Sequence, residues 1–175
     1  MKSYYQFLNE SIKDHLKPMS KDEIRNKIFN RKNAYFTIQD IFENDLYEKG
    51  IISEEEIRVL FLNFKNRNQV DEYAPQFLRD GIITKNDIIT VSELFSNKDK
   101  FYIGIQYNII ELVRQSIDNR VIEQIPHLSS ILSVLYSKGY FDIIKLLLAD
   151  KHVIYVVSSR LVKRLKSDLS KRMDE

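Results

Sequence analysis

Apolar residues recur three and four positions apart along most of this chain, which is the period of an amphipathic α-helix. Leu128, Ile131, Leu132 and Leu135 form one clear run of this kind. Only residues 153–157 are rich enough in β-branched and aromatic side chains to suggest a strand, and no second strand is evident to pair with it. The pattern therefore predicts an all-α protein.

The predicted helices are separated by short polar or glycine-containing stretches. They span residues 4–15, 20–29, 37–48, 53–64, 71–79, 84–95, 105–117, 128–137, 141–148 and 156–169.

Three of these helices begin with the same start signal, a hydroxyl residue followed three positions later by an acid. The hydroxyl residues are Ser20, Ser53 and Thr84. Such a hydroxyl accepts a hydrogen bond from a backbone N–H at the start of the helix, and the acid favours the positive end of the helix dipole. The third copy has Asp87 where Glu or Gln is usual. The sequence alone does not decide whether this shorter side chain also accepts a hydrogen bond from the backbone N–H of Thr84.

The second and third start signals also share the residues before them, a glycine followed by two isoleucines. These are residues 50–52 and 81–83, which are 31 positions apart. We expect Gly50 and Gly81 to end the preceding helices in the left-handed conformation. A second internal similarity relates residues 108–113 to residues 142–147, which are 34 positions apart. Periods of this length predict stacked antiparallel helical hairpins.

Residues 137–148 read Ser-Lys-Gly-Tyr-Phe-Asp-Ile-Ile-Lys-Leu-Leu-Leu and resemble the turn and second helix of an ankyrin repeat. The chain lacks the Thr-Pro-Leu-His opening of that family, so the resemblance implies at most a degenerate ankyrin-like hairpin. Ordinary helix–turn–helix chemistry is the alternative interpretation. The fold class we predict is all-α, with stacked antiparallel hairpins of a degenerate ankyrin-like or other helical-repeat kind.

Composition narrows the classes of function. The chain has 175 residues, of which 43% are hydrophobic and 30% charged, and these are the values of a globular protein. It has no cysteine, which excludes a disulfide scaffold, a thiolate metal site and a cysteine nucleophile. No run approaches the roughly 18 apolar residues of a membrane-spanning helix, and the N-terminus lacks the apolar core of a secretory signal. We therefore expect a soluble protein with no membrane partner.

Residues for catalysis or for binding a cofactor do not cluster in the sequence. The three histidines, His15, His127 and His152, are isolated, and the acidic run at 54–56 is explained by the first turn of a helix. No glycine-rich phosphate loop and no nucleophile motif occurs. The sequence predicts a protein that is not an enzyme and that holds neither a metal nor another cofactor.

Charge is distributed unevenly, although the net charge is only +2. Residues 1–32 hold eight basic and four acidic groups, residues 33–150 hold 12 and 18, and residues 151–175 hold seven and three. On a helical wheel, the last helix places four cations opposite Leu161, Leu165 and Leu169. This basic surface is either a solvated outer face or a docking site for an acidic protein or nucleic acid. It consists of Arg160, Lys163, Arg164 and Lys171.

The first eleven residues, Met-Lys-Ser-Tyr-Tyr-Gln-Phe-Leu-Asn-Glu-Ser, resemble the capsid-targeting sequence of T-even-type phage internal proteins. In that family the segment docks on the prohead scaffold and a protease then cuts after a Leu/Ile-x-Glu site. The resemblance implies a docking face of Tyr4, Phe7 and Leu8. It also implies a processing site at Leu8, Glu10 and Ser11, with cleavage after Glu10.

Three functions are compatible with these patterns. The first is a non-enzymatic accessory protein of a tailed phage, found in the host cytoplasm or the virion interior, in which residues 1–10 are a cleavable targeting helix. Its body, residues 11–175, is then one helical domain with a weak subdivision near 96–100 that binds a phage scaffold or a host factor. The second is a stand-alone helical adaptor that binds other proteins. The third is a nucleic-acid-binding protein that uses its basic ends.

Overall fold

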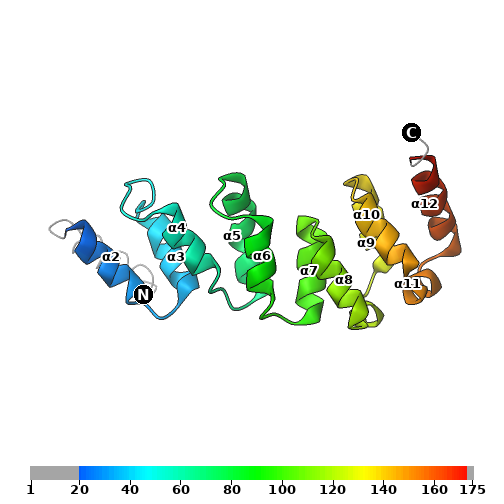
Figure 1. The fold of residues 1–175 in the computed structure, drawn as a ribbon, viewed down its shortest axis with the longest axis horizontal. Coiled ribbons are helices and arrows are strands. Elements are labelled where there is room, and N and C mark those ends of the chain that lie inside the picture. Colours follow the sequence, from blue (N-terminus) through cyan, green and yellow to red (C-terminus); the bar gives the residue numbers. More distant parts are fainter. Residues whose placement is uncertain (1–19, 173–175) are drawn as a thin grey trace, which may run out of the picture. The chain divides into compact units, whose positions relative to one another are not determined.

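A computed structural model describes residues 20–172 of the chain (Figure 1). Within this stretch it contains eleven α-helices, one short 3-10 helix and no strand, which confirms the all-α prediction. The chain divides into two compact units, the first ending at Val91 and the second beginning at Ser92. The predicted helix at 4–15 and the N-terminal docking and processing residues lie outside the described part.

The first unit is built from five helices, three of which begin at the predicted start signals. Ser20 and Ser53 each accept a hydrogen bond from the third backbone N–H of the helix, and Glu23 and Glu56 accept one in return. Thr84 does the same with Asp87, so the shorter acid also completes the reciprocal pair. The helices are α2 (Lys21–Phe29), α3 (Ala34–Glu43), α4 (Glu54–Phe61), α5 (Arg67–Arg79) and α6 (Lys85–Ser92).

The turns that lead into α4 and α6 have the same backbone arrangement. Gly50 and Gly81 have φ angles of 63° and 78°, the left-handed conformation that glycine adopts at low cost. After each glycine, two successive isoleucine N–H groups donate to one carbonyl, that of Leu46 in the first turn and that of Phe77 in the second. The 31-residue sequence repeat is therefore also a structural repeat.

Aromatic side chains dominate the core of the first unit. Phe61, Phe64 and Phe77 are completely buried, and the ring centroid of Phe61 lies 5.1 Å from that of Phe64 and 6.1 Å from that of Phe77. Phe42 stacks on Phe77 at 5.7 Å. Because burying one such side chain contributes roughly 1.5–3 kcal/mol, these contacts hold α3, α4 and α5 together.

The second unit has six α-helices and one 3-10 helix around an aliphatic core. Leu132, Leu135, Ile143, Leu147 and Leu165 are fully buried in it. The elements are α7 (Asn97–Tyr107), α8 (Ile110–Asp118), η1 (Val121–Gln124), α9 (Leu128–Ser137), α10 (Phe141–Ala149), α11 (Lys151–Val156) and α12 (Ser159–Lys171).

Helices α7 and α8 approach each other closely at a glycine. A Cβ atom added to Gly104 would lie 2.7 Å from the Cγ2 atom of Val113 and 3.0 Å from the backbone oxygen of Ile109. Nearby, the buried hydroxyl of Ser116 donates to the carbonyl oxygens of Leu112 at 2.7 Å and of Asn97 at 3.0 Å. The absence of a side chain at Gly104 is what allows the two helices to pack at this distance.

The prediction of one helix over residues 105–117 is wrong. Asn108 is left-handed, with a φ of 53°, and the N–H groups of Asn108 and Ile109 both donate to the carbonyl of Gly104. Helix α7 therefore ends at Tyr107, and α8 starts at Ile110. The apolar spacing runs through this break without a glycine or proline to mark it, so the pattern alone did not reveal it.

The strand suggested at 153–157 is also wrong, because residues 151–156 form helix α11. The side chain of Asp150 accepts hydrogen bonds from the backbone N–H groups of His152 and Val153 and so starts the helix. Val153 is fully buried in the core. The predicted helix at 156–169 accordingly begins later, at Ser159.

Several predicted boundaries shift for similar local reasons. Helix α3 runs from Ala34 to Glu43 instead of 37–48, because Asn33 caps its start and the left-handed Asp45 follows its end. Helix α5 starts at Arg67, four residues before the predicted start, where Asn66 caps it. The polar stretch at 96–100 is the cap and first turn of α7.

The segment that resembles an ankyrin repeat, residues 137–148, contains the end of α9, a turn at Gly139 and most of α10. Gly139 has a φ of 76°, as a tight turn between two helices requires. The segment is therefore a helical hairpin. An ankyrin-like stacking of the hairpins stays a prediction.

Candidate interaction surfaces

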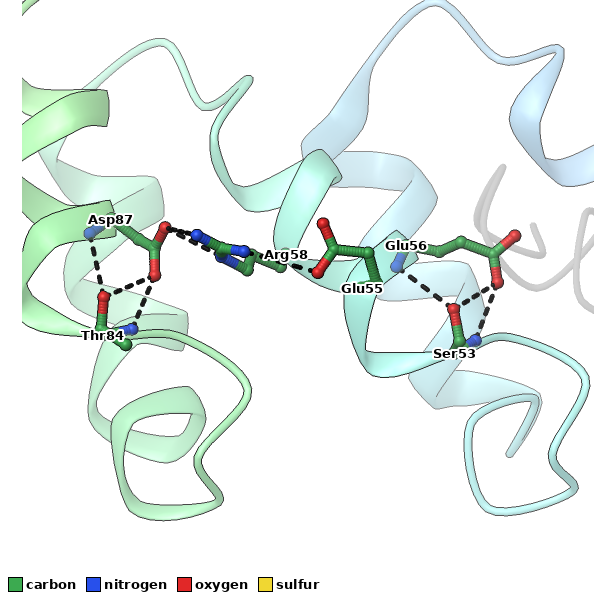
Figure 2. A network of polar contacts seen from close by, with 6 residues as sticks. All are labelled: Ser53, Glu55, Glu56, Arg58, Thr84 and Asp87. Atoms are coloured by element: carbon green, nitrogen blue, oxygen red, sulfur yellow. Dashed lines mark hydrogen bonds and ion pairs between the residues drawn. The ribbon is translucent and has the colours of Figure 1, made fainter.

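Two arginines, Arg25 and Arg58, each connect one helix to the start signal of another in the first unit, and we call these two contacts the arginine ladder. Arg25 of α2 pairs with the capping carboxylate of Glu56 at the start of α4. Arg58 of α4 contacts Oδ1 of Asp87 at the start of α6 through Nε at 2.9 Å and Nη2 at 2.8 Å (Figure 2). Both arginines stand five positions after the hydroxyl residue of their own start signal. Ile89 occupies this position after Thr84.

The ladder accounts for the altered acidity of two carboxyls. Burial of the Asp87 carboxyl raises its pKa, but hydrogen bonds from Arg58 and Thr84 outweigh burial and hold the pKa below its ordinary value. Burial likewise opposes the bonds that Ser53 and Arg25 make to Glu56, and the pKa of Glu56 also lies below its ordinary value. Shifted pKa values can mark active sites, yet here structural ion pairs and helix caps explain them fully.

The part of the chain that the structure describes contains no candidate metal-binding site. Between residues 20 and 172, no three His, Asp or Glu side chains are grouped so that they could hold an ion. Across the same residues, no helix is long and apolar enough to cross a membrane.

The four cations predicted as a basic surface all lie exposed on α12, and the helix buries Val162, Leu165 and Leu169 on its other face. Among the described residues, the side chains of Arg160, Lys163 and Lys171 take part in no hydrogen bond or ion pair. Arg164 differs, because its guanidinium lies 5.6 Å from the ring centroid of Tyr136. Three of the four cations are thus available to an external partner.

Tyr136 and Phe141 attach α12 to the hairpin of α9 and α10. The hydroxyl of Tyr136 donates to Asp168 at 3.1 Å, and the guanidinium of Arg172 lies 4.5 Å from the ring centroid of Phe141. Asp168 is the only acid among residues 151–172, which contain seven basic residues. One acid against seven cations leaves this segment with a strong positive charge.

An exposed apolar cluster precedes the basic helix. Ile154, Tyr155 and Val156 are consecutive in α11, and their exposed fractions are 39%, 88% and 47%. Large apolar side chains that are exposed to water close together in a helix are candidates for an interaction site. We call Ile154, Tyr155, Val156, Arg160 and Lys163 together the C-terminal surface.

Sequence reasoning identified the cations of this surface and missed its apolar part. The β-branched and aromatic residues 153–157 were assigned to a strand, so their exposure on a short helix was not expected. The signal that was available is the capping residue Asp150, whose carboxylate can start a helix at Lys151. The predicted docking residues Tyr4, Phe7 and Leu8 and the processing residues Leu8, Glu10 and Ser11 lie outside the described part.

Comparison with known proteins assigns no relative to this chain. No protein-family model, no curated protein and no solved structure matches it.

Proposed function

We propose that this protein is a non-enzymatic binding protein whose C-terminal surface docks an acidic, partly apolar segment of another protein. The observation that carries the proposal is the exposed triplet Ile154, Tyr155 and Val156, followed directly by a helix whose cations Arg160 and Lys163 have no acidic partner among the described residues.

The two parts of the surface have complementary roles in such binding. Tyrosine is enriched among the residues that contribute most to interface affinity, because a large ring is buried at a low entropic cost. The cations select an acidic partner and speed its approach, an effect that salt weakens. An apolar centre beside charged side chains is the usual composition of a transient protein interface.

A protein segment fits this surface better than a nucleic acid does. Nucleic-acid strands are held by a basic groove with several aromatic side chains on which successive bases stack. Here Tyr155 is the one aromatic member, and its neighbours Ile154 and Val156 are aliphatic. Aliphatic side chains pack well against the apolar residues of a peptide but provide no stacking platform.

A binding measurement with defined probes tests this proposal. The probes are a peptide that mixes Glu and Asp with Leu and Phe, an equally acidic peptide with Ser in place of Leu and Phe, and a single-stranded oligonucleotide. We expect the first peptide to bind best, and we expect Tyr155→Ser to weaken it about tenfold, the effect of losing one central contact. Arg160→Glu combined with Lys163→Glu should abolish binding.

The matched control is Val134→Ser, which removes an apolar side chain of α9 that is exposed like Val156. It should leave the affinity unchanged. Equal binding of the two peptides, or an oligonucleotide that binds more tightly than either, would overturn the proposal. In the last case the basic surface would serve a nucleic acid.

The N-terminal resemblance supports a more specific biological setting, that of a tailed-phage accessory protein. We propose on this basis that a prohead protease cuts between Glu10 and Ser11. Co-expression with such a protease, followed by intact-mass measurement, should show the loss of residues 1–10, and Glu10→Gln should prevent it. An uncut wild-type chain would contradict the setting.

Deletion of residues 1–10 distinguishes a targeting segment from a structural one. If these residues only target the protein, the melting temperature of the deleted form should be nearly unchanged. If they cap the helical stack, their loss should lower the melting temperature.

A further inference from the structure

The first unit contains a cavity of about 280 Å³ that lies where two helices begin. The residues before and at the start of α3 form one wall, and the residues around the start of α5 form another. Leu60, in the last turn of α4, and Asn63, which follows that helix, complete the described lining. The cavity lies wholly within the first unit, and the inference drawn from it does not depend on the C-terminal surface.

Among the residues that the structure describes, three cations and no carboxylate line this cavity. They are Arg31, Lys32 and Lys65. Arg31 is anchored by an ion pair with Asp40, a buried residue of α3. The ammonium groups of Lys32 and Lys65 make no hydrogen bond or ion pair with any residue that the structure describes. Within residues 20–172, the charges of Lys32 and Lys65 are therefore not neutralised by another side chain.

Two amide side chains of the lining have their oxygen atoms occupied by backbone N–H groups. The side-chain oxygen of Asn33 accepts from the N–H groups of Tyr35 and Phe36, and the side-chain oxygen of Gln69 accepts from the N–H of Lys65 at 2.7 Å. Each amide therefore keeps its NH2 group, which only donates. The positive ends of the dipoles of α3 and α5 add to the attraction for an anion.

We propose that this cavity binds a small phosphate-bearing ligand, either inorganic phosphate or a phosphate monoester. A tetrahedral oxyanion is bound by several donors and positive charges, and Lys32, Lys65 and the amide groups of Asn33 and Gln69 are groups of this kind. Leu60 and Ala34 are the apolar residues of the described lining, which therefore includes no aromatic platform for a nucleobase. The volume of the cavity suits a phosphate group with a short organic substituent.

Nuclear magnetic resonance of the 15N-labelled full chain tests the proposal. Inorganic phosphate and glycerol phosphate are titrated separately, with glycerol as the neutral control. We expect saturable shifts of the backbone signals of residues 31–34 and 65–69 with the phosphate ligands and none with glycerol. If only glycerol phosphate saturates, the ligand is a monoester. If inorganic phosphate binds as tightly, the organic part contributes nothing.

Charge-removing variants separate this site from general attraction to a basic protein. Lys32→Gln combined with Lys65→Gln should weaken phosphate binding at least tenfold. Lys21→Gln combined with Lys27→Gln removes two exposed lysines of α2 and should have no effect. Shifts that do not saturate, or that persist in the first double variant, would overturn the proposal. The binding assay at the C-terminal surface can fail without affecting this result.

Discussion

Replacing Gly104 with alanine will destabilise the second unit by about 2 kcal/mol. Alanine favours a helix over glycine by about 1 kcal/mol, so helix propensity alone predicts the opposite sign. The new Cβ would lie 2.7 Å from a methyl group of Val113, which is itself completely buried and has a stiff, β-branched side chain. The backbone N of Val113 and O of Ile109, both at 3.0 Å, limit any relief.

Thermal unfolding of the full chain, followed by circular dichroism, measures this effect. Hydrogen exchange should place the loss of protection in α7 and α8. Gly104→Val should destabilise further, and Val113→Ala should partly rescue Gly104→Ala, because the two changes act on one contact. Ser133→Ala, at an exposed position of α9, is the control and should be nearly neutral. A higher melting temperature for Gly104→Ala would show that α7 and α8 can separate without cost.

Replacing Asp87 with alanine will destabilise the first unit by about 2 kcal/mol at pH 7. Asp87 is only 3% exposed, and its carboxylate accepts hydrogen bonds from the backbone N–H and hydroxyl of Thr84, both at 2.8 Å, and from Arg58. Its loss therefore removes a helix cap and the link between α4 and α6 together. Arg58→Met should also lower the melting temperature, by a smaller amount, because Thr84 still bonds the carboxylate.

The pH dependence of this effect has a definite sign. The pKa of Asp87 is lower in the folded chain than its ordinary value of about 3.9. Its stabilising contribution is therefore present above about pH 4 and is lost as the pH falls through the folded pKa. The difference in stability between wild type and Asp87→Ala should shrink below pH 4. A difference that stays constant from pH 7 to pH 3 would contradict the assigned ion pair.

The control for Arg58 is Arg79→Met. Arg79 has a side chain that is 74% exposed and pairs with Asp80 at 3.7 Å. Surface pairs of this kind contribute little to stability, because water and salt screen them. The melting temperature should not change. The comparison separates the loss of the ladder contact from the general effect of removing an arginine.

Much of the fold could be predicted because its signals are local. A hydroxyl and an acid three residues apart satisfy the first N–H groups of a helix without help from the rest of the chain, so Ser20, Ser53 and Thr84 marked true helix starts. The left-handed helix ends at Gly50 and Gly81 could be predicted equally well, because few other residues adopt a positive φ without strain. The errors fall where Asn108, Asp45 and Asp150 redirect the chain, since residues of these types occur in many other conformations.

The candidate surfaces could be predicted only in part. The cations of α12 follow from the helical period, which separates them from Leu165 and Leu169 at any helix with this sequence. The exposure of Tyr155 depends on where α11 ends and on Val153 filling the core, and neither is a property of the local sequence. The cavity with Lys32 and Lys65 joins residues more than 30 positions apart.

The sequence by itself determined the all-helical class, the helix starts and the 31-residue repeat, because hydrogen bonds between near neighbours specify them. Only the tertiary structure decided that Arg25 and Arg58 reach the capping carboxylates of the next repeat, that Gly104 brings α7 and α8 together, and that Lys32 and Lys65 line one cavity. These features depend on how separate helices pack, and the energy of such packing is shared among residues that are distant in the chain.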